Sequence, residues 1–432
     1  MTRASAARTK VAGRASKGFG HGDHFDHLER REPMQRDRDM LAALPDLLRR
    51  AIAGAPALAE HLPGFDPTAV TSFAALSELP VLRKSDLSER QQADPPFGGL
   101  TTMPVAQLAK LFMSPGPILE PEGNRPDYWR FARAMYAAGI RPGEVVHNAF
   151  AYHLTPAGSM VESGARAIGC PVIPAGTGQT ELQLTVIARV RPAAFAGTPS
   201  FLKILLERGR ADGVDTSCLK KALVGGEAFP RALADWFEGE FGVRAYQCYG
   251  TADLGLIAYE TPPREGLVID EGVLVEIVRP GTGDPVPAGE VGEVVVTAFN
   301  PDYPLIRFAT GDLSAILPGQ SPCGRTNRRL RGWLGRADQT TKVKGLFVYP
   351  RQIAEITRRH PEISRARLVV ERHEHVDRMT LQCEVDARPD GLAEAIAATL
   401  TSITGLRGDV ALAAPGELAN DGKVIDDRRA HG

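Results

Sequence analysis

Between residues 108 and 224 the chain alternates short apolar runs with longer amphipathic segments, and this alternation restricts the fold most strongly. Short apolar runs bounded by glycine or proline are typical of buried strands, whereas the amphipathic segments have the spacing of helices. Strands connected through helices and short loops predict a largely parallel sheet in an α/β domain. The predicted order is strand 145–150, helix 158–168, strand 171–174, helix 181–190, strand 193–197 and strand 221–226.

The predicted order of strands and helices changes twice toward the C-terminus. Two β-branched segments, 273–278 and 292–298, predict strands of a β-rich subdomain at about 266–325, with 281–284 as a hairpin turn. A basic, irregular stretch, 323–331, predicts a linker. Beyond it, the order strand, helix, strand, strand, helix, strand predicts a small ferredoxin-like α+β domain over 335–432, beginning with a strand at 341–344.

The N-terminal part divides into a tail and the start of the large domain. Residues 1–36 predict a disordered segment or an N-terminal extension, because the first twenty are basic and lack an apolar core. Apolar residues at helical spacing over 37–52 predict the first helix of a domain that extends to residue 334. A further helix is expected to be capped at Ser85.

Composition excludes several classes of protein. The 432 residues carry a net charge of −1, which produces no field that would attract nucleic acid. No apolar run reaches 18 residues, so no membrane span is expected. The five cysteines are scattered and form no CxxC pair, which argues against zinc and favours a reducing, cytoplasmic location.

Two stretches predict a ligand site by their chemistry. Gly225-Gly226 follows an apolar strand, and two glycines let a ligand approach the backbone closely. The stretch 249–253 then offers an aromatic face for a base in Tyr249, a hydroxyl for a phosphate in Thr251 and an acid for Mg²⁺ in Asp253. Read alone, the glycine pair is more often a plain turn, and the alternative for 249–253 is a strand-to-loop turn with Asp253 as a capping residue.

Four stretches together resemble a known family. In order they are Tyr-Gly-Thr-Ala-Asp at 249–253, Arg-Phe-Ala-Thr-Gly-Asp-Leu at 307–313, Gly-Arg-Ala-Asp at 335–338 and Gly-Lys at 422–423. This order is similar to that of the adenylate-forming superfamily, and within it to the phenylacetate–CoA ligase family. The resemblance implies that ATP activates a small aromatic or arylacetic acid as an acyl-adenylate, and that the CoA thiol then takes the acyl group.

The resemblance also implies roles for individual residues. Lys423 would neutralise charge on the α-phosphate during adenylation, Asp253 would hold Mg²⁺, and Asp338 would be the hinge of a rotating C-terminal domain, whose loop 343–345 would then reach the active site. ATP would be contacted by Gly225, Gly226, Glu227, Tyr249, Gly250, Thr251, Asp312 and Arg336, and the acyl group by Phe150, Tyr152 and His153.

Two departures from the family pattern bear on activity. The family places glutamate where this chain has Asp253, which is one methylene shorter, so Mg²⁺ is expected to be held through water. The phosphate-binding loop is degenerate and keeps only Ser114 and Gly116, among three prolines that remove amide donors and two acids that oppose phosphate charge. Two other interpretations therefore stay open: an adenylating enzyme that uses a carrier protein or an amine as acceptor, and a non-catalytic nucleotide- or acyl-binding protein.

Overall fold

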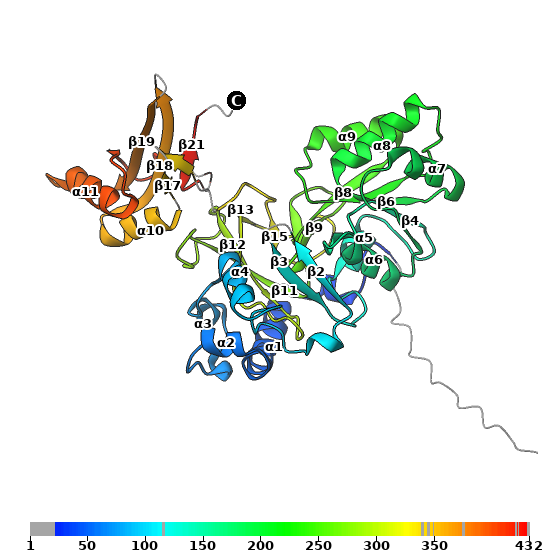
Figure 1. Ribbon diagram of the computed structural model, residues 1–432, viewed down its shortest axis with the longest axis horizontal. Helices are drawn as coiled ribbons and strands as arrows, with labels where there is room; N and C mark the ends of the chain where they lie inside the picture. The colour runs from blue at the N-terminus through cyan, green and yellow to red at the C-terminus, as the bar shows by residue number, and fades with distance from the viewer. Residues whose placement is uncertain are drawn as a thin grey trace, which may run out of the picture.

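The computed structural model describes residues 22–114, 117–337, 341–343, 346–348, 350–373, 376–419, 421 and 423–429. A large body contains the elements up to β15, and a smaller one contains those from β17 onward (Figure 1). No helix in these ranges is both long enough and apolar enough to cross a membrane.

A nine-stranded mixed sheet forms the centre of the large body. Its five strands at one side are parallel to one another, as the sequence predicts, and the remaining strands continue it in antiparallel fashion from β8 onward. The order across the sheet is β14 (Ile316–Leu317), β15 (Arg329–Leu330), β10 (Leu267–Ile269), β9 (Gly255–Glu260), β8 (Arg244–Thr251), β7 (Lys221–Val224), β6 (Ala194–Gly197), β4 (Val146–Asn148) and β5 (Val172–Pro174).

Helices cover both faces of the parallel part. Residues of β6 alternate between two hydrophobic clusters: Ala194 and Ala196 pack into one, and Phe195 packs into the other. A sheet that is buried on both faces explains why its strands are continuous apolar runs. The helices are α5 (Phe131–Ala137) and α6 (Ala157–Ile168) on one face, with α7 (Thr180–Val190), α8 (Pro199–Ala211) and α9 (Arg231–Phe241) contributing to the other cluster.

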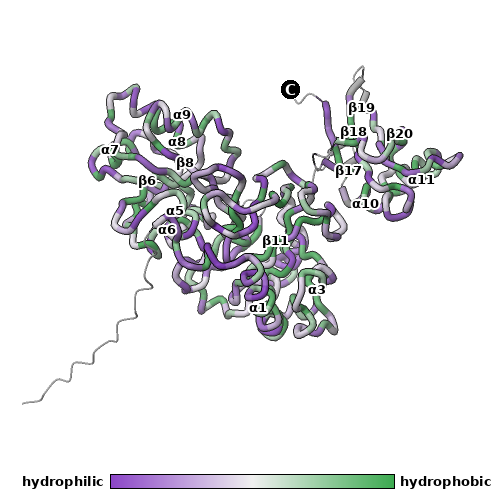
Figure 2. The backbone as a smooth tube through the Cα atoms, turned by 180° about the vertical axis from the view of Figure 1, so that it is seen from behind, coloured by the Kyte–Doolittle hydropathy of each residue, from purple (hydrophilic) through white to green (hydrophobic). Residues whose placement is uncertain are grey.

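A second, four-stranded sheet lies in the large body. Its strands β11 and β12 are buried along their whole length, and Figure 2 labels β11 within the large body. The order is β1 (Leu82–Arg83), β13 (Phe308–Ser314), β12 (Gly292–Ala298) and β11 (Val273–Val278). The two predicted β-branched strands are therefore confirmed, and residues 281–284 lie in the connection between them.

The N-terminal helices pack beside this second sheet. The predicted helix over 37–52 is confirmed and is longer than expected, because Pro33 occupies its first turn, where a missing amide costs nothing. A separate hairpin of β2 (Lys110–Ser114) and β3 (Ile118–Glu122) follows. The helical elements here are η1 (His27–Arg30), α1 (Pro33–Gly54), α2 (Pro56–His61), η2 (Pro67–Ala69), α3 (Phe73–Ser77), α4 (Lys84–Ala93) and η3 (Val105–Gln107).

The C-terminal body has its own sheet and its own hydrophobic cluster. The order is β20 (Asp409–Ala413), β19 (Val376–Val385), β18 (Ile363–His373) and β21 (Ile425–Asp427), with α10 (Pro350–Arg359) and α11 (Leu392–Thr404) packed against it. The strand predicted at 341–344 is observed as β16 (Thr341–Val343), but it pairs with β17 (Leu346–Val348) in a separate hairpin. The fourth place in the sheet is taken by β21, parallel to β18.

Two local predictions are wrong. The stretch 323–331 is no simple linker, because it contributes β15 to the nine-stranded sheet and buries Arg325 against Glu29. Helix α4 begins at Lys84, and Asp86 rather than Ser85 bonds the backbone amide of the cap residue Arg83. The basic side chains of residues 323–331 suggested an exposed segment. Local sequence does not show that Arg325 forms a buried ion pair with Glu29, which is distant in the chain.

Candidate nucleotide site

The carboxylate of Asp312 is the centre of a hydrogen-bonded cluster on β13. Oδ2 accepts a 2.9 Å hydrogen bond from the hydroxyl of Tyr249, while Oδ1 accepts from Nε1 of Trp333 at 3.0 Å and from Nη1 of Arg336 at 3.1 Å. Burial and the neighbouring carboxylate raise the pKa of Tyr249 well above its usual range, so its hydroxyl remains a donor. The structure therefore brings together three of the predicted residues, Tyr249, Asp312 and Arg336.

The backbone places these groups. The segment that carries Trp333 and Arg336 runs beside β13, with hydrogen bonds from the amide of Leu313 to the carbonyl of Gly335 and from the amide of Ala337 to the carbonyl of Gly311. Gly311 has a φ of +73°, and a Cβ there would lie 2.6 Å from Nη2 of Arg336. A glycine is therefore required for the guanidinium to cross the strand at this point.

The two glycines after β7 lie at the carboxyl edge of the parallel strands. A Cβ on Gly225 would meet Sγ of Cys248 at 2.9 Å, and Gly226 has a φ of +79°. The carboxylate of Glu227 accepts a 2.9 Å hydrogen bond from the Ser200 hydroxyl. This edge is where ligands bind in open α/β sheets, but none of these contacts reaches Asp312.

The turn between β8 and β9 holds Asp253 almost completely buried. Oδ2 of Asp253 lies 2.9 Å from Nζ of Lys84, at the start of α4, while Oδ1 is buried with no hydrogen-bond partner in the described structure. Thr251 uses its hydroxyl within the same turn, where it accepts from the Leu254 amide. A Cβ on Gly250 would lie 2.5 Å from the Gly255 carbonyl oxygen, so glycine is needed for the turn.

These residues supply one candidate ligand atom for Mg²⁺. The unpartnered Oδ1 of Asp253 is an anionic oxygen, the atom type that Mg²⁺ prefers. No cluster of three or more acidic, histidine or cysteine side chains suited to a metal occurs in the described part of the chain. The site therefore fits a Mg²⁺ that is bound through one carboxylate and otherwise through phosphate and water, which is the usual way that nucleotide enzymes hold it.

The stretch predicted to be a degenerate phosphate loop spans strands β2 and β3 of the hairpin. Ser114 ends β2, and both its amide and its hydroxyl are bonded to the carboxyl of Glu120, at 3.1 and 2.5 Å. Gly116 lies outside the described residues. Glu120 is fully buried, and this burial raises its pKa to about 7. Both donors of Ser114 are thus satisfied within the hairpin.

The predicted acyl-pocket residues lie at the end of β4. Nδ2 of Asn148 donates to the Tyr152 hydroxyl at 2.7 Å and to the Gly158 carbonyl at 2.8 Å, which fixes the ring over the start of α6. Phe150 is half-buried, and its ring lies 4.0 Å from the position of a Cβ on Gly225. His153 is exposed, with no hydrogen bond or ion pair to the described residues.

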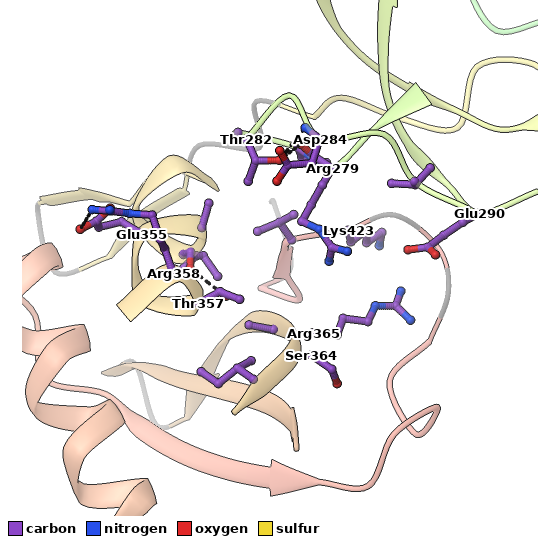
Figure 3. Close-up of a pocket in the computed structure, with 18 of the residues that line it drawn as sticks. Arg279, Thr282, Asp284, Glu290, Glu355, Thr357, Arg358, Ser364, Arg365 and Lys423 are labelled. Carbon is purple, nitrogen blue, oxygen red and sulfur yellow. Dashed lines mark hydrogen bonds and ion pairs between the residues drawn. The ribbon is translucent and has the colours of Figure 1, made fainter. Parts of the chain in front are cut away.

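Lys423 lies away from these groups, in the C-terminal body. Its ammonium is 3.2 Å from Oδ1 of Asp426, and its side chain lines a cavity of about 690 Å³. Figure 3 shows the wall of this cavity opposite α10 and β18, which comes from the β11–β12 connection with Arg279, Thr282 and Asp284. The predicted hinge residue Asp338, together with Lys344 and Gly345 of the predicted loop, lies outside the described residues.

Three contacts of the site were missed by sequence reasoning: Lys84 on Asp253, Glu120 on Ser114, and Trp333 on Asp312. Only Glu120 gave a signal, because it was noted as an acid in a loop that should bind phosphate. Conversely, Arg307 of the Arg-Phe-Ala-Thr-Gly-Asp stretch has a structural role. It is buried in a bidentate ion pair with Glu276 and also binds backbone carbonyls.

A doubly covered α/β sheet, a separate small C-terminal body and a carboxylate held by tyrosine and arginine together define an adenylate-forming enzyme. Comparison with family models agrees. The model of the AMP-binding enzyme family matches residues 152–299, and that of the AMP-binding enzyme C-terminal domain matches residues 345–428.

Similarity to individual proteins identifies a narrower family within the adenylate-forming enzymes. The chain is 33% identical to a phenylacetate-coenzyme A ligase of Thermus thermophilus over 74% of this chain and 75% of that protein. It is 30% identical to the Escherichia coli enzyme of the same name, over 74% and 76%. A crystal structure of 2-hydroxyisobutyryl-CoA ligase in an open conformation, with its acyl-AMP and CoA, superposes with a TM-score of 0.72, at 25% identity, over 95% of this chain and 96% of that one.

The chain belongs to the phenylacetate-coenzyme A ligase family. It is accordingly an AMP-forming acid–CoA ligase.

Proposed function

We propose that this protein activates a small aromatic or arylacetic acid with ATP and then transfers the acyl group to the thiol of CoA. The observation that carries the proposal is the meeting of Tyr249, Asp312 and Arg336 at one carboxylate in a chain of this family. A buried carboxylate at hydrogen-bonding distance from several donors is suited to exchange one of them for ribose hydroxyls.

The acyl group would lie toward the end of β4. Phe150 and Tyr152 supply aromatic surface there, and the Asn148 hydrogen bond holds the Tyr152 ring in place. Aromatic faces favour an aromatic acid through offset or edge contacts. His153 is proposed to lie at the exposed mouth of this region.

The chain's residues would act in two stages. In the first, the Lys423 ammonium would neutralise charge that builds at the α-phosphate, and Asp253 would contribute an oxygen to Mg²⁺. In the second, the C-terminal domain would turn about Asp338. We also propose the division into domains 37–334 and 335–432, because the C-terminal body has a hydrophobic cluster of its own.

The experiment is a pyrophosphate-release assay with ATP and Mg²⁺ over a panel of carboxylic acids, with and without CoA. Acid-dependent release, followed by CoA-dependent thioester formation, is the expected result. Release with a carrier-protein thiol or an amine but not with CoA would select the other acceptors. Absence of release with every acid would favour a non-catalytic nucleotide- or acyl-binding protein, an alternative that the hydrogen bonds between Ser114 and Glu120 support.

We also propose a location and an assembly state. All five cysteines are free thiols, which suits a cytoplasmic protein. We also propose a homodimer, which the mass in solution measured by light scattering would test.

A further inference from the structure

The carboxyl of Glu120 accepts hydrogen bonds from both donors of Ser114, in the stretch that resembles the phosphate loop. Phosphate loops bind anions through backbone amides and hydroxyls that point toward the ligand. In this chain the amide and the hydroxyl of Ser114 both point to Glu120. Glu120 itself is fully buried, so the pair forms an internal anion site that is already filled.

The hairpin is fixed beside Asp253 by helix α4. Gln91 of this helix donates from Nε2 to the Leu119 carbonyl and accepts from the Leu119 amide, both at 2.8 Å. The same helix begins with Lys84, whose ammonium pairs with Asp253. The carboxyl of Glu120 lies within the electrostatic influence of both Asp253 and Lys84. Lys84 therefore pairs with Asp253, and the charges of these two residues act in opposite directions on the pKa of Glu120.

This arrangement disfavours the binding of a nucleoside triphosphate more than the binding of a monophosphate. The terminal phosphates of ATP need donors and positive charge, yet both donors of Ser114 are bonded to Glu120 and Lys84 is paired with Asp253. An AMP or acyl-adenylate ligand carries only the α-phosphate and makes no demand on that loop. The difference between the affinity for ATP and the affinity for AMP should therefore depend on the charge of Glu120.

We propose that Glu120 is a specificity-determining residue that lowers the affinity of the site for ATP relative to AMP and acyl-adenylate. This inference rests on the proposed function, because it assumes that the nucleotide binds at Asp312 with its phosphates toward the β2–β3 hairpin. It predicts a protein that holds its adenylate product more tightly than its ATP substrate.

The test compares ATP and AMP binding by calorimetry in the full-length protein and in Glu120→Gln at pH 8.5, where the parent carboxyl is ionised. Glutamine keeps the size of the side chain and can still accept from the Ser114 amide through Oε1 and donate to the Ser114 hydroxyl through Nε2, so the substitution mainly removes the charge. We expect the dissociation constant for ATP to fall about tenfold, the effect of one charge interaction of about 1.4 kcal/mol. The constant for AMP should change less than twofold.

The matched control is Glu122→Gln. Glu122 is a buried acid on the same strand, but it is paired with Lys110 and bonded to Ser159 and Trp129. This variant should leave the ratio of ATP to AMP affinity unchanged. Ser114→Ala, which keeps the Glu120 charge, should preserve the preference for AMP even if Glu120→Gln folds poorly.

The outcomes separate this inference from the proposed function. If AMP binds but ATP affinity is the same in the parent and in Glu120→Gln, or if Ser114→Ala binds ATP as tightly as AMP, the role of Glu120 is overturned and the nucleotide site stands. If neither nucleotide binds the parent or any variant, the proposed function and this inference are overturned together.

Discussion

The hydroxyl of Tyr249 and the carboxylate of Asp312 are joined by a 2.9 Å hydrogen bond that links the nine-stranded sheet to the four-stranded sheet. Tyr249 lies on β8 and Asp312 on β13, 63 residues apart in the chain. The proposed nucleotide site therefore lies where two sheets meet, and its geometry depends on both. A ligand that binds there is expected to stabilise the contact between the sheets by mass action.

Replacing Asp312 tests the centre of the site. Asp312→Ala should weaken ATP binding by about 1.5–3 kcal/mol, the range for hydrogen bonds to a charged group. Calorimetry with ATP and AMP measures the loss, and Asp284→Ala, an exposed acid in the β11–β12 connection, serves as control. Unchanged affinity in Asp312→Ala would remove this carboxylate from the nucleotide site.

Replacing Gly311 tests whether the position of Arg336 matters for nucleotide binding, independently of backbone strain. Gly311 and Gly289 both have positive φ, at +73° and +84°, but only at Gly311 would a Cβ meet Arg336. Alanine at either position should cost about 1–2 kcal/mol of unfolding free energy, because an L-residue is strained there. The exposed Arg336 side chain can move aside, so Gly311→Ala should lose little more stability, but it should lose the hydrogen bond to Asp312.

Denaturant unfolding and calorimetry check these two variants. We expect similar unfolding free energies, with weakened ATP binding in Gly311→Ala only. Equal ATP affinity in both variants would mean that the position of Arg336 over Gly311 does not matter for the nucleotide.

The sequence predicted the regular elements of this fold more completely than it predicted the site. Strands β6 and β7 were readable because burial on both faces leaves a continuous apolar run. The contact of Lys84 with Asp253 joins residues 169 positions apart, and Trp333 approaches Asp312 only because its segment runs beside β13. Such contacts depend on how elements far apart in the sequence pack together, so no local sequence pattern predicts them. The site residues taken from the family order remain predictions until the variants are measured.

Asp253 is predicted to be a metal ligand. Its Oδ1 is buried without a partner, whereas Lys84 holds Oδ2. Asp253→Asn should lower the rate of adenylation and raise the Mg²⁺ concentration needed for half-maximal rate, because a neutral amide binds a hard cation poorly. Asp302→Asn, which changes an acid paired with Arg125, is the control. If the Mg²⁺ curves of Asp253→Asn and the parent superimpose, Asp253 does not bind the metal.

Glu120 should make stability depend on pH. Burial raises its pKa from 4.5 to about 7, so the folded state binds the proton more tightly than the unfolded state. Its contribution to stability is therefore complete below about pH 4.5 and is lost as pH rises through 7, with a total of about 3 kcal/mol. Asp127 has a similarly raised pKa, so the parent curve alone is not sufficient.

The difference between the parent and Glu120→Gln isolates this carboxyl. Urea unfolding at intervals from pH 4.5 to pH 8.5 should show the parent losing more stability than the variant as pH rises. Parallel curves would mean that the Glu120 carboxyl titrates alike in the folded and unfolded states.

Lys423 tests the two-stage mechanism. Its ammonium faces Asp426 in the C-terminal body and makes no hydrogen bond or ion pair with Asp312 or Asp253 in the described structure. The proposed adenylation step therefore requires the C-terminal domain to present this lysine to the α-phosphate. Loss of one well-placed charged donor in a water-excluded site costs about 10²–10³ in rate. Lys423→Ala should lose adenylate formation by that factor, while thiolysis of a supplied acyl-adenylate should be nearly unaffected.

A matched lysine controls for the loss of a surface charge. Lys203 is exposed to a similar extent and also pairs with an acid on its own element, Glu207, so Lys203→Ala should leave both half-reactions intact. Rapid-quench measurement of adenylate formation and of thioester formation distinguishes the results. If the C-terminal domain turns between the two half-reactions, Lys423 is absent from the site during thiolysis. Equal losses of rate in both half-reactions of Lys423→Ala would therefore contradict the proposal that Lys423 serves adenylation alone. Intact adenylation would mean that Lys423 is a solvated residue and that another cation meets the α-phosphate.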